Sequence, residues 1–520
     1  MAATLVGELA AAATDSPKAE FLRTAEDSLT FAEVHELVEQ SARTLVSLRV
    51  EQGERVGIRL PNGSNWVITW LAVLRIGAVA VPVNCAYETS DLDHVLSDSG
   101  ASMIITDEEG RNKVEGTEAW ATGSLMVVVD LVNSGHGTAS KELPPLENIT
   151  ARTLANLQYT SGTTGFPKAC MLAHEYWMTL GRRAQENVDA DVGDVTITTQ
   201  PFSYMDPQWN TTLCLLARIP LVIRPRFSAS RFWDWVREEG VTFFYVLGTM
   251  PTLLYKQEPT SADKDNRVRI VMCSGIPPAL HRQLEERWDA PWREAYGMTE
   301  TGIDLCVPLA AQSSVGSGII GWPVAGKEAR VLSPDGSETA PGEQGELVVR
   351  GKPLMKGYWN LPDATAEVMR DGWFHTGDVV IQREDGAFRL VGRIKDMVRR
   401  GGENISSAEV ENAANQHSDI IASAVVAVPD DLWGEQVKLF LLPKEGRTPS
   451  RALAEDVFEL LQDHLARFKL PALIAFVDTF PLTPSERIIK SQIPEALATE
   501  GPGVFAMALS VPNKNQKEHR

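Results

Sequence analysis

Residues 159–170 form the segment that most restricts how this chain can fold, because no ordinary core strand or helix requires such a composition. The segment reads Tyr-Thr-Ser-Gly-Thr-Thr-Gly-Phe-Pro-Lys-Ala-Cys and follows the apolar run Leu154–Tyr159. We predict a short strand leading into a loop whose hydroxyl groups, glycines and lysine surround a phosphate. The candidate phosphate-binding residues are Thr160, Ser161, Gly162, Thr163, Thr164, Gly165 and Lys168.

The spacing of this segment excludes the P-loop of nucleoside triphosphatases. A P-loop has the pattern Gly-x-x-x-x-Gly-Lys-Ser/Thr, whereas only two residues separate Gly162 from Gly165, and Ala169 follows Lys168. A Ser/Thr/Gly-rich loop exposed to solvent is the alternative interpretation.

The size and charge of the chain limit its organisation and its ligands. A chain of 520 residues is longer than one hydrophobic core usually supports, so we expect at least two domains. The net charge of -20 argues against nucleic acid as a partner, although local cations and backbone amides can still hold ATP or coenzyme A. The sequence has no apolar run of membrane-spanning length and no basic-then-apolar leader, so we expect a cytoplasmic protein without a membrane span.

The cysteines do not form the close pairs that mark a zinc site or a disulfide framework. We expect five reduced, mostly buried thiols, which are Cys85, Cys170, Cys214, Cys273 and Cys306.

Strand and helix patterns alternate in the N-terminal part of the chain. Thr30 is a predicted helix N-cap before a periodic run to Leu48, and Trp66–Ile76 is a predicted apolar helix. Strands are predicted at Arg55–Leu60 and Val79–Val83. This alternation predicts mostly parallel α/β layers.

Further segments point to a known superfamily. The chain has Trp-Arg-Glu-Ala-Tyr-Gly-Met-Thr-Glu-Thr at 292–301, Trp-Phe-His-Thr-Gly-Asp at 373–378 and Gly-Arg-Ile-Lys-Asp at 392–396. With residues 159–170, these segments resemble the motifs of the adenylate-forming superfamily, in particular its acyl-CoA ligase branch. The resemblance implies an acid–thiol ligase that joins a carboxylic acid to AMP, using ATP and Mg²⁺, and then passes the acyl group to coenzyme A.

The same resemblance implies an α/β fold with two domains and a site between them. We expect a large N-terminal domain of layered α/β sheets with a β subdomain, plus a small mobile C-terminal α+β domain. The proposed division is 1–394 for nucleotide and acyl binding and 395–520 for the mobile domain, with Lys395 as the hinge and a frayed tail at 513–520.

The resemblance also assigns the nucleotide site. Tyr296 would offer an aromatic face to adenine, Gly297 would allow close approach, and Asp378 would accept hydrogen bonds from the ribose hydroxyls. Thr299 would bind the α-phosphate and Glu300 would hold magnesium, although Thr299 could instead be a helix N-cap. The other implied nucleotide contacts are Ser274, Gly275 and Arg393.

The implied acyl pocket is apolar. Its expected walls are Tyr204, Trp209, Gly248, Thr249, Cys273, Gly275, Tyr296, Gly297 and Met298. Tyr204 stands where the family has a histidine, so an aromatic lid replaces any histidine role. Since none of these residues is an Asp or Lys that could pair with an α-amino group, we expect a hydrophobic organic acid rather than an amino acid.

A glycine pair follows the predicted hinge. By resemblance, Gly401 and Gly402 would let pantetheine pass the backbone, while Arg399 or Arg400 would meet coenzyme A phosphates. A plain β-hairpin turn with solvated arginines is the alternative.

One position departs from the family. Glu486-Arg487 stands where the family has Gly-Lys, and that lysine is catalytic for adenylation. The expected catalytic set is therefore Arg487, Thr299, Glu300 and Lys168. Arginine keeps the charge but not the compact shape of lysine.

Three interpretations follow from this departure. In the first, the chain is a complete ligase in which Arg487 or Lys490 acts as the catalytic cation. In the second, a separate adenylating enzyme makes the acyl adenylate, and this chain only transfers the acyl group to coenzyme A. A nucleotide- and acyl-binding sensor without turnover is the third.

Overall fold

The chain forms two compact units. The computed structural model describes residues 3–132, 142–160, 167–400, 403–430, 432–482, 488–494 and 503–507, together with Ala496 and Thr499. The large unit contains residues up to Arg330 and Val348–His375, and the small unit contains Val331–Leu347, residues 376–482 and the described residues from 488 onward. The predicted division at residues 394 and 395 and the mobility of the C-terminal domain remain predictions.

The first sheet of the large unit is parallel except at one edge, where β7 and β8 run antiparallel. Its strands, in spatial order, are β6 (Met126–Val129), β5 (Met103–Thr106), β3 (Arg55–Arg59), β4 (Val79–Pro82), β7 (Leu154–Thr160) and β8 (Lys168–Ala173). Side chains alternate along β7, so Leu157 packs with α4 (Thr89–Ser99) and Asn156 meets α3 (Ser64–Arg75). Helices therefore cover both faces, as the sequence pattern predicted.

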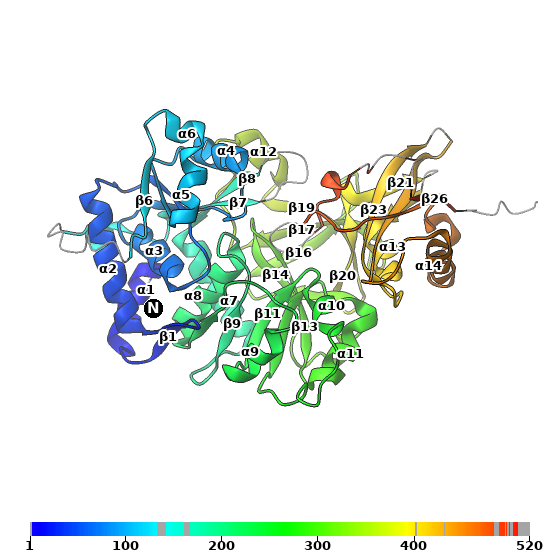
Figure 1. Ribbon diagram of the computed structural model, residues 1–520, viewed down its shortest axis with the longest axis horizontal. Helices are drawn as coiled ribbons and strands as arrows, with labels where there is room; N and C mark the ends of the chain where they lie inside the picture. The colour runs from blue at the N-terminus through cyan, green and yellow to red at the C-terminus, as the bar shows by residue number, and fades with distance from the viewer. Residues whose placement is uncertain are drawn as a thin grey trace, which may run out of the picture. The chain divides into compact units, whose positions relative to one another are not determined.

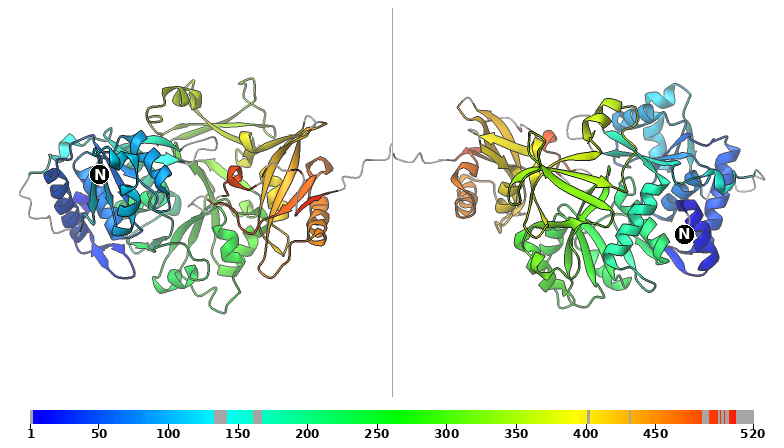
Figure 2. Two further views of the ribbon diagram at one scale, coloured as in Figure 1. Left: turned by 45° about the horizontal axis from the view of Figure 1, so that its top comes forward. Right: turned by 180° about the vertical axis from the view of Figure 1, so that it is seen from behind.

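The remaining helices near this sheet include the one with the predicted cap. Thr30 and Glu33 form a capping box at the start of α2 (Phe31–Ser47), which confirms the predicted helix start. Figure 2 shows these helices in blue and cyan around the sheet. The others are α1 (Leu5–Asp15), α5 (Glu108–Glu115) and α6 (Glu118–Ala121).

The second sheet of the large unit positions the candidate site (Figure 1). Its strands, in spatial order, are β2 (Ser28–Thr30), β1 (Glu20–Arg23), β10 (Leu221–Ile223), β9 (Thr196–Thr198), β11 (Phe243–Leu247), β12 (Ile270–Ser274), β13 (Trp292–Met298), β14 (Gly302–Cys306) and β15 (Ile319–Pro323). Pairing is parallel from β1 to β13 and antiparallel from β13 to β15. Between the two sheets lie α7 (His174–Val188) and α8 (Met205–Ala217), which pack on each other; α8 contacts β9 and hydrogen-bonds to β7.

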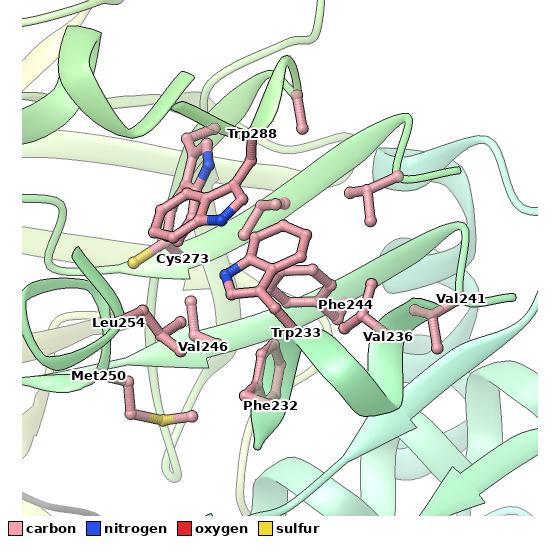
Figure 3. Close-up of a cluster of buried hydrophobic side chains, with 14 of the residues drawn as sticks. Phe232, Trp233, Val236, Val241, Phe244, Val246, Met250, Leu254, Cys273 and Trp288 are labelled. Atoms are coloured by element: carbon pink, nitrogen blue, oxygen red, sulfur yellow. The ribbon is translucent and has the colours of Figure 1, made fainter. Parts of the chain in front are cut away.

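An aromatic core backs the second sheet (Figure 3). Trp233 of α9 (Phe232–Glu238) stacks on Trp288 of α11 (Pro278–Trp288), with ring centroids 4.7 Å apart. The thiol of Cys273 and the side chain of Met250, in α10 (Met250–Tyr255), belong to the same cluster. The β12 face that carries Cys273 is therefore filled by core side chains.

Hairpin strands follow the second sheet in the sequence. Asp335 accepts hydrogen bonds from Ser337 at the Pro-Asp-Gly turn, and the Gly336 N–H donates to the Ser333 carbonyl. The elements of this region are β16 (Lys327–Leu332), β17 (Gln344–Gly351), α12 (Pro362–Val368), β18 (Met369–Arg370), β19 (Trp373–Gln382) and β20 (Phe388–Arg393).

The C-terminal part of the small unit is a sheet with helices on one face. In spatial order its strands are β22 (Glu403–Ser406), β21 (Met397–Arg400), β24 (Gly434–Pro443), β25 (Leu473–Phe476) and β26 (Val504–Ala506), with β23 (Ile420–Asp430) also paired to β24. One face packs against α13 (Ser407–Ala414) and α14 (Arg451–His464). This arrangement confirms the predicted small α+β domain.

Among the residues that the structure describes, no helix combines the length and apolar character needed to cross a bilayer. All five cysteines are free thiols, and four of them are buried.

Candidate active site

Four parallel strands bring the predicted nucleotide and acyl residues to one edge of the second sheet. Because β9, β11, β12 and β13 are paired in parallel, their carboxyl ends lie side by side, where open α/β sheets bind ligands. The predicted residues in or after these ends are Tyr204, Gly248, Thr249, Ser274, Gly275, Tyr296, Gly297 and Met298. The structure therefore gathers residues that lie far apart in the sequence.

A buried carboxylate fixes the turn after β12. The Gly275 N–H donates to Glu294 at 2.5 Å and the Ile276 N–H at 2.8 Å. Gly275 has a φ of 100°, a conformation that favours glycine. Burial raises the pKa of Glu294 to about 8, against the effect of the two N–H donors. Sequence reasoning missed Glu294, although an acidic residue in a buried strand was a signal.

We expect Glu294 to make the stability of the protein depend on pH. Since burial raises its pKa from the usual 4.5 to about 8, the folded protein keeps a proton that the unfolded chain releases. This contribution is fully present below the unfolded-state pKa and is lost as pH rises through the folded-state value. Between about pH 5 and about pH 9, the wild type should lose about 1 to 3 kcal/mol of unfolding free energy relative to Glu294→Gln. Urea unfolding of both proteins measures this, and parallel pH profiles would contradict it.

Trp209 and Tyr245 form an aromatic wall beside the same edge. Their ring centroids are 5.2 Å apart with an interplanar angle of 71°. The Tyr245 hydroxyl donates to Ser274 Oγ at 2.8 Å, which in turn donates to the carbonyl of Ala295. Tyr245 was not predicted, because strand periodicity alone does not show which aromatic residue of β11 meets α8. The side chain of Cys273 lies in the core instead, so we give it no part in the proposed acyl pocket.

Buried amides join the turn that carries Tyr204 to the strand before the phosphate loop. Asn156 donates to Gln208 at 2.7 Å, and Gln208 donates to Gln158 at 3.0 Å and to the Tyr204 carbonyl at 3.0 Å. Gln158 donates to the Ser203 carbonyl at 2.6 Å. The acyl side of the site is thus fastened to β7 by side chains that sequence reasoning did not single out.

The turn between β13 and β14 carries Thr299 and Glu300. The alternative of a helix N-cap at Thr299 is wrong, because a strand and not a helix follows this turn. The Tyr358 hydroxyl donates to Glu300 Oε1 at 2.8 Å. A Cβ at Gly297 would lie 2.0 Å from the Gly302 carbonyl oxygen, so the hairpin itself requires this glycine.

Lys168 contacts the ring of Tyr358, the residue whose hydroxyl donates to Glu300. Its Nζ is 5.1 Å from the centroid of the Tyr358 ring, a cation–π distance. Thr160 and Lys168 face each other across the β7–β8 pair, so the ends of the predicted phosphate loop are held together. Ser161, Gly162, Thr163, Thr164 and Gly165 lie outside the described residues.

The half-buried carboxylate of Glu300 suits the metal that the sequence implies. Mg²⁺ prefers oxygen ligands and commonly binds one or two carboxylates together with substrate phosphates. The Glu300 carboxylate, joined through Tyr358 to Lys168, fits that preference.

The small unit holds the predicted ribose residue. Asp378 is buried and faces Arg393 across the β19–β20 pair, with Arg393 Nε donating to Oδ1 at 2.9 Å. Lys395 lies in a short 3₁₀ turn after β20. This arrangement brings Asp378 and Arg393 together and leaves the hinge role of Lys395 a prediction.

The two arginines of β21 differ in their surroundings. Arg400 is buried and donates to the carbonyls of Phe468 and Leu470, whereas Arg399 is exposed. Arg399 is therefore the stronger candidate for a phosphate contact. β21 and β22 do form a hairpin, but Gly401 and Gly402 lie outside the described residues.

Arg487, the predicted catalytic cation, also lies outside the described residues. Lys490, its possible substitute, has its Nζ 2.8 Å from Glu411 Oε1, and Glu411 also accepts from the Val425 N–H. Lys490 is thus engaged within the small unit.

Comparisons with known proteins identify the family. A family model described as AMP-binding enzyme matches residues 9–359, and the model of its C-terminal domain matches residues 409–487. The chain belongs to the AMP-binding enzyme family. This AMP-binding enzyme is 34% identical over 483 residues to feruloyl-CoA synthase from an Amycolatopsis species, covering 92% of this chain and 96% of the relative.

Other relatives agree with this assignment. Oxalate–CoA ligase from Arabidopsis thaliana is 31% identical over 480 residues, covering 89% of this chain and 92% of the relative. A crystal structure of ATP-bound MatB from Rhodopseudomonas palustris matches with a TM-score of 0.85 and 27% identity, covering 94% of this chain and 98% of that one. The predicted superfamily, its acyl-CoA ligase branch and the fold class are confirmed.

Proposed function

We propose that this AMP-binding enzyme converts a hydrophobic carboxylic acid to its CoA thioester through an acyl-AMP intermediate. The acid–thiol ligase class predicted from the sequence is confirmed by the CoA ligases among its relatives. The observation that best supports the proposal is that Glu300 and Lys168 both contact Tyr358, because this brings together the predicted metal ligand and the predicted phosphate-binding cation.

The predicted nucleotide and catalytic residues have the following roles in this proposal. Lys168 and the loop before it hold the ATP phosphates, and Thr299 binds the α-phosphate. Glu300 would hold Mg²⁺, which would supply charge neutralisation on the phosphates. Asp378 accepts hydrogen bonds from the ribose hydroxyls. Arg487 supplies a positive charge between the acyl carboxylate and the α-phosphate while negative charge is redistributed during attack.

The acceptor in the second half-reaction is coenzyme A. Arg399 is placed to offer an exposed cation to its phosphates. This half-reaction does not need the Arg487 cation, because phosphate activation is complete by then.

The hydrophobic character of the acid is supported by local residues and not by the relatives, which are named for acids as different as ferulic and oxalic acid. Trp209 and Tyr245 present aromatic rings at the acyl edge, as suits an apolar ligand. The five free thiols support a reducing compartment, and we propose the cytoplasm.

The alternatives of a transferase for preformed adenylates and of a sensor without turnover are not favoured by the relatives. An acid panel in an ATP–pyrophosphate exchange assay tests the substrate proposal. Aromatic and medium-chain acids should exceed oxalate and free amino acids by at least about tenfold in kcat/KM, the size expected for apolar pocket selectivity. A preference for oxalate or an amino acid would contradict it.

A further inference from the structure

A buried ion pair lies behind the turn that carries Glu300. Lys327 of β16 and Asp304 of β14 have side chains that are 1% and 0% exposed, and Lys327 Nζ is 2.9 Å from Asp304 Oδ1. Burying two charges costs several kcal/mol per ion before their attraction offsets it, and an apolar pair is often as stable. A buried pair at this place therefore calls for a role other than stability.

The Lys327 ammonium also makes two hydrogen bonds. Besides its ion pair with Asp304, it donates to the carbonyl oxygens of Thr301 and Pro353, each at 2.6 Å. The Thr301 hydroxyl donates to Asp304 Oδ2. The pair thus joins β14, β16, the β13–β14 turn and the segment before Met355.

Three consecutive carbonyls of the turn are held by three different elements. The Thr299 carbonyl accepts from the Tyr176 hydroxyl at 2.8 Å, and the Glu300 carbonyl accepts from the Met355 N–H at 2.7 Å. The Thr301 carbonyl accepts from Lys327. Because Lys327 also holds Pro353, two residues before Met355, it supports both the residue that follows Glu300 and the segment that donates to the Glu300 carbonyl.

We propose that the Lys327–Asp304 pair is a positioning device that fixes Glu300 and Thr299 for the metal-bound nucleotide. An apolar pair could fill the same volume but could not donate to the carbonyls of Thr301 and Pro353 together. Preorganised contacts matter most where charge changes during the reaction, so small displacements of a metal ligand lower turnover strongly. The metal role of Glu300 rests on the proposed function.

The test compares two double variants of the full-length protein. Lys327→Met with Asp304→Asn removes both charges and keeps the side-chain volumes. Arg287→Met with Asp263→Asn is the matched control, because Arg287 pairs with Asp263 at 2.7 Å and also donates to backbone carbonyls. The two control side chains are somewhat more exposed, at 11% and 12%, than Lys327 and Asp304, at 1% and 0%.

We expect the Lys327/Asp304 variant to raise the Mg²⁺ concentration for half-maximal pyrophosphate exchange by about tenfold, while the control stays within about twofold. Without nucleotide, amide hydrogen exchange at residues 299–303 should be faster in this variant only. Wild-type Mg²⁺ dependence and wild-type amide exchange, or equal changes in the control, would overturn the proposal.

Two further comparisons keep the test decisive. If the double variant does not fold, Asp304→Asn alone should raise the Mg²⁺ midpoint by about threefold, and a wild-type midpoint would overturn the proposal. If the wild type itself shows no exchange with any acid, the proposed function fails, whereas the amide exchange comparison still tests the positioning of the turn.

Discussion

Replacing Glu300 with glutamine should lower acid-dependent ATP–pyrophosphate exchange by about a hundred- to a thousandfold, the usual effect of losing one preorganised charge contact. Glutamine keeps an oxygen that can accept from the Tyr358 hydroxyl, so the turn should stay in place. The lost property is the negative charge that attracts Mg²⁺. Formation of acyl-CoA from a synthetic acyl adenylate should change little.

The matched control for Glu300→Gln is Glu328→Gln. Glu328 is exposed and pairs with Arg350 at 2.6 Å, so its loss should change exchange by less than about twofold, as for most surface ion pairs. If Glu300→Gln lowered both half-reactions equally, the defect would lie in folding or in shared binding, and the metal role of Glu300 would be wrong.

Replacing Arg487 with alanine should lower pyrophosphate exchange by about a hundredfold or more and leave thioester formation from the adenylate almost unchanged. The reason is that this cation acts where the carboxylate attacks the α-phosphate, and only in adenylation. Arg487→Lys should equal or exceed the wild type, because lysine is a more compact point charge. Exchange unaffected by Arg487→Ala would contradict this assignment.

Two further variants of the small unit serve as comparisons for Arg487→Ala. Arg447→Ala removes an exposed arginine 3.0 Å from Asp419 and should keep both activities. Lys490→Met should lower the stability of the small unit, because it leaves the partly buried Glu411 carboxylate without its 2.8 Å partner. If Lys490→Met lost pyrophosphate exchange but kept thioester formation, Lys490 would instead be the cation that acts in adenylation.

Short-range patterns were sufficient for most of the fold. The Thr30 cap and the strands Arg55–Leu60 and Val79–Val83 were predicted because their signals lie within a few residues. The resemblance to the adenylate-forming superfamily then identified the motifs and their order along the chain. The topology then explains why Tyr204, Gly275 and Tyr296 belong to one edge of the sheet, since they lie in or after the carboxyl ends of the parallel strands β9, β12 and β13.

The residues that support the site could not be found in this way. In the sequence, Lys327 and Asp304 look like ordinary surface charges, but both side chains are buried in the folded protein. Tyr358 joins Glu300 and Lys168 although 58 residues separate it from the first. Such pairings depend on tertiary contacts, for which a single sequence carries no periodic signal.

Measuring the two half-reactions separately tests the ligase assignment most directly. One assay follows acid-dependent exchange of labelled pyrophosphate into ATP across an acid panel, and the other follows acyl-CoA formed from a synthetic acyl adenylate and coenzyme A. We predict that both are active in the wild type, with Arg487 in place. Thioester formation without exchange for any acid would contradict a complete ligase and indicate a separate adenylating enzyme, and activity in neither assay would indicate a sensor.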